Sequence, residues 1–423
     1  MLAAKPAPQS AFPARVIVLI VVAAIVLSLS IGLRQSLGLF LRPINADLGV
    51  SAAAFGFAMA LQNIVWGLSQ PVVGMLGDRH GARPVLIASA LVYAAGLLLM
   101  AMGGPALGLD LGGGVVAGIG VAGTSFGVLL GAVSRAVPVE RRSQMVGLVS
   151  AAGSLGTLVL APLGQTLIDG YGWRTALLAF AGVALLMGAI AALIGRPAAT
   201  APAPSDGEAA ASTGVALLQA AGHRGYVAMA VSFFACGFQL MFITTHLPQF
   251  LVICGLPPSV GASALGLIGL GNAVGSYVVG LLGARYSQKR LLALIYLLRT
   301  LAIAVYLAAP ISAASTLVFA AGMGFLWLSV APLVSGLIGR MFGLRHFNTL
   351  FGLTFLSHQI GAFVGAWLGG VTFDLTGSYA TAWTAMIVVG LAAAALQWSM
   401  DDRAAAPGRP NAAPNAGLAM QDA

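Results

Sequence analysis

The sequence predicts an all-α polytopic membrane protein, with twelve transmembrane helices arranged in two pseudo-symmetric six-helix halves. The first observation is composition, because 59% of the residues are hydrophobic and only 7% are charged, whereas about a quarter of a soluble domain is charged. The second is that apolar segments of about 20 residues, the length a helix needs to cross a bilayer, recur along the chain. The third is an internal repeat.

The repeat relates the two halves of the chain at a nearly constant offset. One block recurs 205 positions later, so that Gly147, Gly156, Gly164, Asp169 and Gly172 have counterparts in Gly352, Gly361, Gly369, Asp374 and Gly377. A shorter block that begins at Gly74 recurs at Gly280, 206 positions later. Duplicated halves of this kind build membrane proteins whose site lies near the midplane, between the repeats.

We predict spans at residues 16–41, 52–76, 84–104, 111–136, 144–167, 175–195, 225–252, 259–284, 289–309, 314–338, 348–373 and 380–399. The first six form an N-terminal half (1–196), and the last six form a C-terminal half (222–400). Residues 197–221 are rich in Ala, Pro and Ser and are expected to form a flexible cytoplasmic linker. Residues 401–423 are similarly biased and are expected to be a disordered cytoplasmic tail.

The charged residues predict the orientation. On an even-span model, nearly all Lys and Arg residues outside the spans lie on one side, and only Arg42 and Arg174 lie on the other. The positive-inside rule then places both termini in the cytoplasm. The net charge of +9 therefore indicates topology in a cell inner membrane and not nucleic-acid binding. The expected surroundings are the lipid bilayer, and we expect a monomer.

Two cysteines, Cys236 and Cys254, are too few for a disulfide framework or a zinc site. No metal, cofactor or catalytic residue is predicted. All eleven acidic residues fall in loops, tails or helix ends.

We interpret a charged segment between the second and third spans as a turn, and its residues are Gly74, Gly77, Asp78, Arg79, Gly81 and Arg83. It resembles the signature loop between helices 2 and 3 of the major facilitator superfamily, and Gly172-Trp173-Arg174 after the fifth span strengthens the resemblance. The resemblance implies a twelve-helix secondary transporter that works by alternating access. Asp78 would then act in a cytoplasmic latch by neutralising the positive N-terminus of a helix in the other half. The alternative is that these charges only fix topology.

Four titratable residues fall inside spans: Arg34, His246, Arg299 and His358. An arginine at the centre of a membrane helix costs about 2.5 to 3.5 kcal/mol and is usually partnered or functional. Two interpretations of Arg34 remain open. Its guanidinium faces a central cleft and receives an anionic group, or it reaches outward to the membrane surface. Arg299 is expected to pack against a neighbouring helix.

The other candidate residues for substrate binding are His358, His246, Gln359, Asn63 and Gln62. Each histidine is either functional or a hydrogen-bonded packing residue. Gln62, Trp66 and Gln70 follow helical spacing on span 2, with Asn63 beside them. Such a polar stripe lines a cleft or joins helices through hydrogen bonds.

A basic residue in span 1 and a positive cleft resemble the monocarboxylate and oxalate/formate branch of the superfamily. This implies a small organic anion, a monocarboxylate, as substrate, with the proton as a candidate co-substrate. The acidic-basic pair that monocarboxylate carriers place in span 8 is missing here. The alternative is a carrier that exports drugs or other small solutes. A remote alternative is an intramembrane enzyme or a sensor, since Gly123 to Gly127 matches a nucleophile elbow and would pair Ser125 with His358.

Overall fold

The computed structural model describes residues 12–195, 217–327, 329–342 and 347–404. Every named element in this part of the chain is a helix. The elements are α1 (Ala14–Gln35), η1 (Leu37–Phe40), α2 (Leu41–Leu48), α3 (Ala52–His80), α4 (Ala82–Met102), η2 (Pro105–Val116), α5 (Ala117–Thr124), α6 (Phe126–Ala136), α7 (Val139–Ala191), α9 (Arg224–Ile253), α10 (Pro258–Arg285), α11 (Gln288–Ala308), α12 (Ala313–Phe325), α13 (Val330–Phe342), α14 (Phe347–Thr376) and α15 (Ala380–Ser399).

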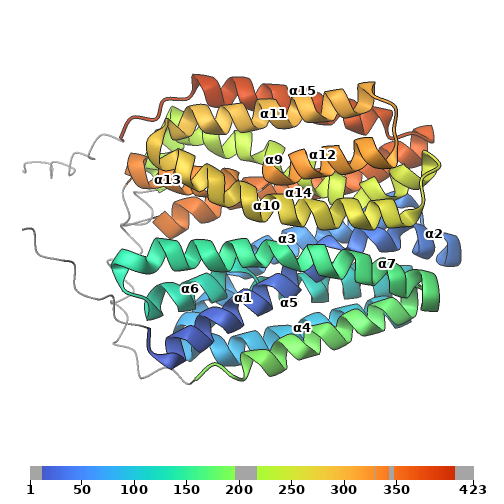
Figure 1. The fold of residues 1–423 in the computed structure, drawn as a ribbon, viewed down its shortest axis with the longest axis horizontal. Coiled ribbons are helices and arrows are strands. Elements are labelled where there is room, and N and C mark those ends of the chain that lie inside the picture. The colour runs from blue at the N-terminus through green and yellow to red at the C-terminus, as the bar shows by residue number, and fades with distance from the viewer. Residues whose placement is uncertain (1–11, 196–216, 328, 343–346, 405–423) are drawn as a thin grey trace, which may run out of the picture.

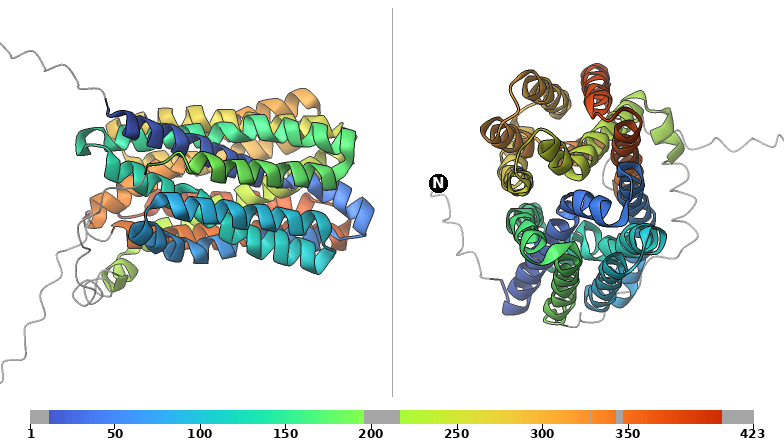
Figure 2. Two further views of the ribbon diagram at one scale, coloured as in Figure 1. Left: turned by 90° about the horizontal axis from the view of Figure 1, so that it is seen from below. Right: turned by 90° about the vertical axis from the view of Figure 1, so that its right-hand side faces the viewer.

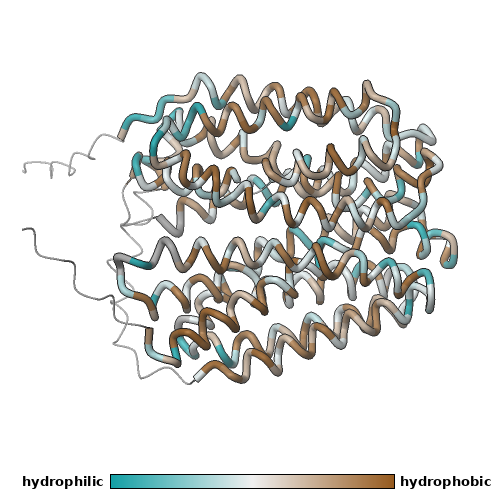
Figure 3. The backbone as a smooth tube through the Cα atoms, viewed as in Figure 1, coloured by the Kyte–Doolittle hydropathy of each residue, from teal (hydrophilic) through white to brown (hydrophobic). Residues whose placement is uncertain are grey.

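The helices run along one common direction and form two bundles (Figure 1). α1 to α7 make one bundle and α9 to α15 the other, and the end-on view in Figure 2 shows the two lying against each other. Apolar and mixed segments alternate along the helices, while hydrophilic residues gather at the two ends (Figure 3). This is the distribution expected of a chain whose middle lies in hydrocarbon.

Within the described ranges, eleven helices are long and apolar enough to cross a membrane. One of them, Met145–Ala191, has 47 residues and would measure about 70 Å if straight, more than twice the hydrocarbon thickness. It reverses at Gly172, whose φ of 80° is non-helical, so it crosses twice. The twelve-span prediction is confirmed.

One prediction about a helix boundary is wrong. The segment from Gly74 to His80 is not a turn, because α3 continues to His80 and only Gly81, with φ of 83°, leaves the helix. Gly74 and Gly77 lie inside this helix, although glycine in a helix interior is about 1 kcal/mol less favourable than alanine. Residues 217–222, at the end of the predicted linker, are helical. Residues 196–216 and the tail after 404 lie outside the described part.

Spans 4 and 10 are interrupted, although both were predicted as continuous helices. Ser125 is extended (φ −104°, ψ −162°) between α5 and α6, and α12 ends at Phe325 before α13 starts at Val330. The second break, residues 326–329, lies 201 to 204 positions after Ser125, close to the offset of 205 between the two halves. A break at membrane depth frees backbone groups that only the protein can satisfy.

Arg299 donates hydrogen bonds to two backbone carbonyl groups at the second break. It is fully buried, its Nε donates to Leu326 O at 3.0 Å and its Nη2 donates to Trp327 O. The geometry agrees with the packing role expected of this residue.

We predict that Arg299→Met lowers the thermal midpoint of the purified protein in detergent. The change leaves two buried carbonyls without donors, at about 1 to 3 kcal/mol each. Arg290→Met, on an exposed position of the same helix, is the matched control and should melt like the wild type. Equal midpoints for all three proteins would show that Arg299 does not hold the break.

The two bundles meet through close backbone contacts. A Cβ added at Gly38 would lie 1.9 Å from Thr244 O, and one at Gly370 would lie 2.2 Å from Ala52 O. Only glycine permits these approaches. Asp374 at the end of α14 adds a polar contact, because its carboxylate accepts the backbone N–H groups of Ala52 and Ala53 at 3.1 and 2.7 Å. It thereby caps the first turn of α3 from the other bundle.

Candidate functional site

Arg34 lies in the last turn of α1, between the two bundles. Its Nη2 donates to Asn63 Oδ1 on α3 and to Met241 Sδ on α9, the latter at 3.1 Å, and its Cζ lies 4.7 Å from the centre of the Trp66 ring. A cation over an aromatic face is attracted by the ring quadrupole. The guanidinium is therefore held inside the molecule, which favours the cleft interpretation over an outward-reaching side chain.

None of the partners of Arg34 is acidic. Asn63, Met241 and Trp66 are neutral, and the buried Nε of Arg34 has no partner in the described part of the chain. No ion pair of Arg34 with a described carboxylate is present. The site thus holds a positive charge with a free hydrogen-bond donor, and an oxyanion is the group that could satisfy both.

Asn63 connects Arg34 to the second bundle. The Asn63 side chain is fully buried, and its backbone carbonyl accepts a hydrogen bond from Gln359 Nε2 on α14 at 2.9 Å. Gln359 is also fully buried, and its Oε1 lies 3.1 Å from Nδ1 of His358. A continuous polar chain therefore runs from Arg34 through Asn63 and Gln359 to His358.

This chain fixes the neutral tautomer of His358. Because Gln359 Nε2 donates to Asn63 O, its Oε1 faces the imidazole, so Nδ1 of His358 must carry the hydrogen. The other nitrogen, Nε2, is buried without a partner in the described part of the chain. It offers a lone pair to a proton or to a donor on a bound molecule.

Aromatic side chains surround this chain. The Phe355 ring stacks on His358 at 5.6 Å with an interplanar angle of 7°, and Phe233 lies 5.0 Å from His358 on another side. Phe355 also meets Trp66 edge to face at 5.6 Å. Sequence analysis placed Trp66 on the polar stripe but missed both phenylalanines, because one Phe among many in an apolar span carries no signal.

The polar residues predicted to share one face of α3 make two different kinds of contact. Gln62 is buried and donates to Gly113 O of η2 at 2.8 Å, so it joins helices within the first bundle. Trp66 Nε1 donates to Gln70 Oε1 at 2.8 Å and to Ser125 Oγ at 3.0 Å. These bonds support the break in span 4 on the side facing Arg34.

The structure does not bring His246 to the site. His246 is fully buried, its Nε2 lies 2.7 Å from Ala366 O and its Nδ1 lies 3.2 Å from the Tyr379 hydroxyl. A carbonyl can only accept, so Nε2 donates and Nδ1 accepts from the tyrosine. Both nitrogens are satisfied within the second bundle, which indicates packing.

The remaining candidates are placed as follows. Ser125 hydrogen bonds with Trp66, Gln70 and the Ala122 carbonyl, whereas His358 bonds to Gln359. Within the described part of the chain the two do not form a catalytic pair. In the proposed latch, Gly77 packs on Val128 with a Cβ position 3.5 Å from that side chain. The side chain of Asp78 lies outside what the structure describes, and the latch stays a prediction.

A family model with the description Major Facilitator Superfamily matches residues 20–331. The chain belongs to this superfamily. It is 30% identical to human Monocarboxylate transporter 11 over 370 residues, which cover 83% of this chain and 75% of the relative. It is 28% identical to rat Monocarboxylate transporter 13 over 356 residues, 83% of this chain and 81% of the relative. These relatives are named as transporters, and the chain is a membrane transporter and not an enzyme.

Two solved structures share the fold. A bacterial homologue of the human lysosomal transporter Spinster, in an inward-facing and unoccupied conformation, matches with a TM-score of 0.71 at 16% identity, over 92% of this chain and 97% of the other. A D-xylose-proton symporter matches with a TM-score of 0.69 at 15% identity, over 92% and 98%. At such identities the likeness concerns the fold alone.

Proposed function

We propose that this carrier moves a small organic anion, a monocarboxylate, across the cell inner membrane by alternating access. The observation that carries the proposal is the uncompensated guanidinium of Arg34 between the two bundles. A carboxylate would supply the missing negative charge and engage the planar fork through two hydrogen bonds. The named monocarboxylate relatives support the same substrate class.

The body of the substrate would lie against aromatic rings. Trp66 and Phe355 come from opposite bundles and meet edge to face beside Arg34. Such a surface suits a short apolar chain or ring attached to the carboxylate. Anchoring one substrate on both bundles would also let its binding bias their relative position.

His358 is proposed to carry the coupled proton. Its free Nε2 lies on the hydrogen-bonded chain that begins at Arg34. Protonation of the imidazole beside an arginine becomes more favourable once a carboxylate neutralises the arginine. Anion and proton would thus bind together, which is the requirement for symport.

The Lys and Arg asymmetry supports an orientation with both termini in the cytoplasm. α2, the start of α3 and the end of α14 then lie at the outer end. The segment from Gly74 to Arg83 lies at the inner end, where Asp78 is proposed to latch the bundles.

Arg34→Gln should abolish monocarboxylate uptake into proteoliposomes, measured over a panel that includes acetate, lactate, pyruvate and benzoate. We expect kcat/KM to fall at least about 100-fold, equivalent to about 3 kcal/mol, because a charge-assisted bidentate contact is lost. Arg34→Lys should retain part of the activity because it keeps the charge but not the fork. Normal uptake by Arg34→Gln at equal abundance, or preference for a cation, would refute the anion site.

His358→Gln should remove accumulation driven by an inward proton gradient while leaving exchange of labelled for unlabelled monocarboxylate, because exchange needs no net proton movement. His246→Gln is the matched control: it changes a histidine whose nitrogens are both bonded, so coupling should survive. Gradient-driven accumulation by His358→Gln at the wild-type level would assign the proton to another group.

Asp78→Asn should lower the maximal transport rate several-fold while leaving the equilibrium dissociation constant of the monocarboxylate within about threefold. A latch acts on the balance between conformations more than on the site. Rates and dissociation constants come from uptake and from thermal-shift titration of the same preparation. A variant that transports at the wild-type rate would leave Asp78 with a topological role only.

A further inference from the structure

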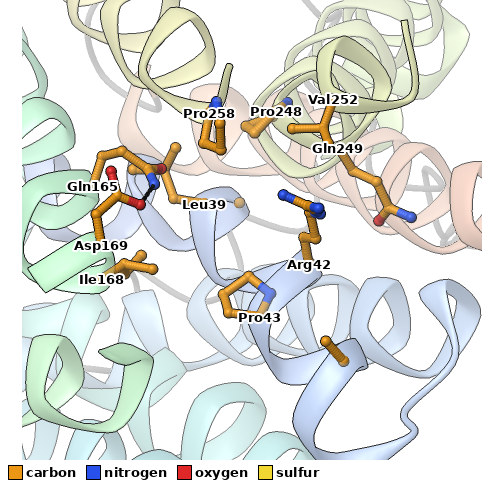
Figure 4. A pocket seen from close by; sticks show the side chains of 12 residues that line it. Leu39, Arg42, Pro43, Gln165, Ile168, Asp169, Pro248, Gln249, Val252 and Pro258 are labelled. Atoms are coloured by element: carbon orange, nitrogen blue, oxygen red, sulfur yellow. Dashed lines mark hydrogen bonds between the residues drawn. The ribbon is translucent and has the colours of Figure 1, made fainter. Parts of the chain in front are cut away.

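A cavity of about 280 Å³ lies at the outer end, between the two bundles. Figure 4 shows its walls, with the Arg42 side chain reaching into it from α2 and Gln249 lying beside it on α9. Gln165 and Asp169 on α7 line the opposite side, and their side chains bond to each other at 2.8 Å. The cavity therefore draws on both bundles, as a substrate path must.

The internal repeat explains why the cavity lies on this flank. On the other flank, Asp374 closes the bundles together by accepting two N–H groups from the first turn of α3. Asp169 is the repeat counterpart of Asp374, and it lies near the start of α10. There the chain reads Pro257-Pro258, and proline has no N–H to donate. Asp169 instead accepts a hydrogen bond from Gln165 on its own helix. It therefore does not join the two bundles, and the cavity lies on this flank.

Arg42 is the cation of this cavity. It is exposed, and no hydrogen bond or ion pair of its side chain occurs with any described residue. The other basic residue on the outer face, Arg174, is bound to Asp47 at 2.5 Å. The two arginines carry equal charge at the same end of the molecule. Of the two, Arg42 is the one whose guanidinium has no partner among the described residues and can bind an anion.

The cavity points toward the central site. Arg42 follows Arg34 by eight residues on the same span, about 12 Å at 1.5 Å per residue. Gly38, which lines the cavity, lies midway and is pressed against the Thr244 carbonyl of α9. The contact between Gly38 and Thr244 thus lies between Arg42 in the cavity and Arg34 in the central site.

We propose that the outer cavity is a docking site for the organic anion, in which Arg42 receives the carboxylate before the bundles separate at Gly38 and pass it to Arg34. The inference rests on the proposed function. Asp169 on the facing wall disfavours an anion and sets how tightly the site holds it. A docking site that releases its ligand inward needs such weak binding.

The test is sided transport by purified protein in proteoliposomes, with the panel monocarboxylate that the wild type takes up fastest. Labelling of Cys254, which is exposed at the end of α9, with an impermeant maleimide determines the fraction of each orientation. Half-saturation concentrations are measured for uptake from the outer face and for efflux from the inner face.

Arg42→Gln should raise the outer half-saturation concentration about three- to tenfold, since it removes local attraction of the anion, and should leave the inner value within twofold. Asp169→Asn should lower the outer value, because it removes the opposing charge. Arg174→Gln, the matched control, should change neither value, and Arg42→Lys should recover most of the wild-type behaviour.

The proposal is overturned if Arg42→Gln behaves like Arg174→Gln, if both faces change equally, or if Asp169→Asn raises the outer value. Failure of the proposed function gives a different result, because the wild type itself would then take up no panel carboxylate, or Arg34→Gln would take it up normally. A carrier whose Arg34→Gln variant is inactive and whose Arg42→Gln variant is normal has a central anion site without outer docking.

Discussion

A positive charge at the interface between two helical bundles, without a carboxylate partner among the described residues, is the constraint on which the rest of this structure depends. Arg34 is held by an amide, a thioether and an indole face, and each of these stabilises a cation only in part. The surrounding groups continue this pattern: Asn63 is shared with Gln359, and Gln359 orients His358. Polar groups that would be costly in hydrocarbon are thereby linked in one chain between the halves.

The four titratable residues within the spans fall into two pairs according to the location of their hydrogen-bond partners. Arg299 and His246 direct their hydrogen bonds to backbone carbonyls within the second bundle. Arg34 and His358 belong instead to the hydrogen-bonded chain that joins the two bundles through Asn63 and Gln359. Within the described part of the chain, Arg34, His358 and Arg299 each keep a buried nitrogen without a partner. The two pairs are therefore separated by where their bonded partners lie, and neither by residue type nor by an unbonded nitrogen.

Much of the fold followed from the sequence because bilayer thickness imposes a length on every apolar segment, and because the glycine repeat marks corresponding helices. The interruptions at Ser125 and after Phe325 did not follow, since both lie in apolar sequence whose composition is that of a continuous span. For the candidate site, the cost of burying a charge drew attention to all four titratable residues within the spans, Arg34, His246, Arg299 and His358. The aromatic surroundings of Arg34 and His358 and the separate placement of His246 depend on helix rotation, which the periodicity of nearly uniform apolar spans cannot define.

Gly38 controls how closely the two bundles of this carrier approach each other. The contact between its α-carbon and the Thr244 carbonyl leaves no room for a methyl group, so a glycine hydrogen sets how closely the two bundles approach at this point. A side chain of any size there would hold the two bundles apart at this end, and it would bias the resting population toward conformations that are open there without altering a charge. Sequence drift at this one position could thus tune the occupancy of states in related carriers independently of what they carry.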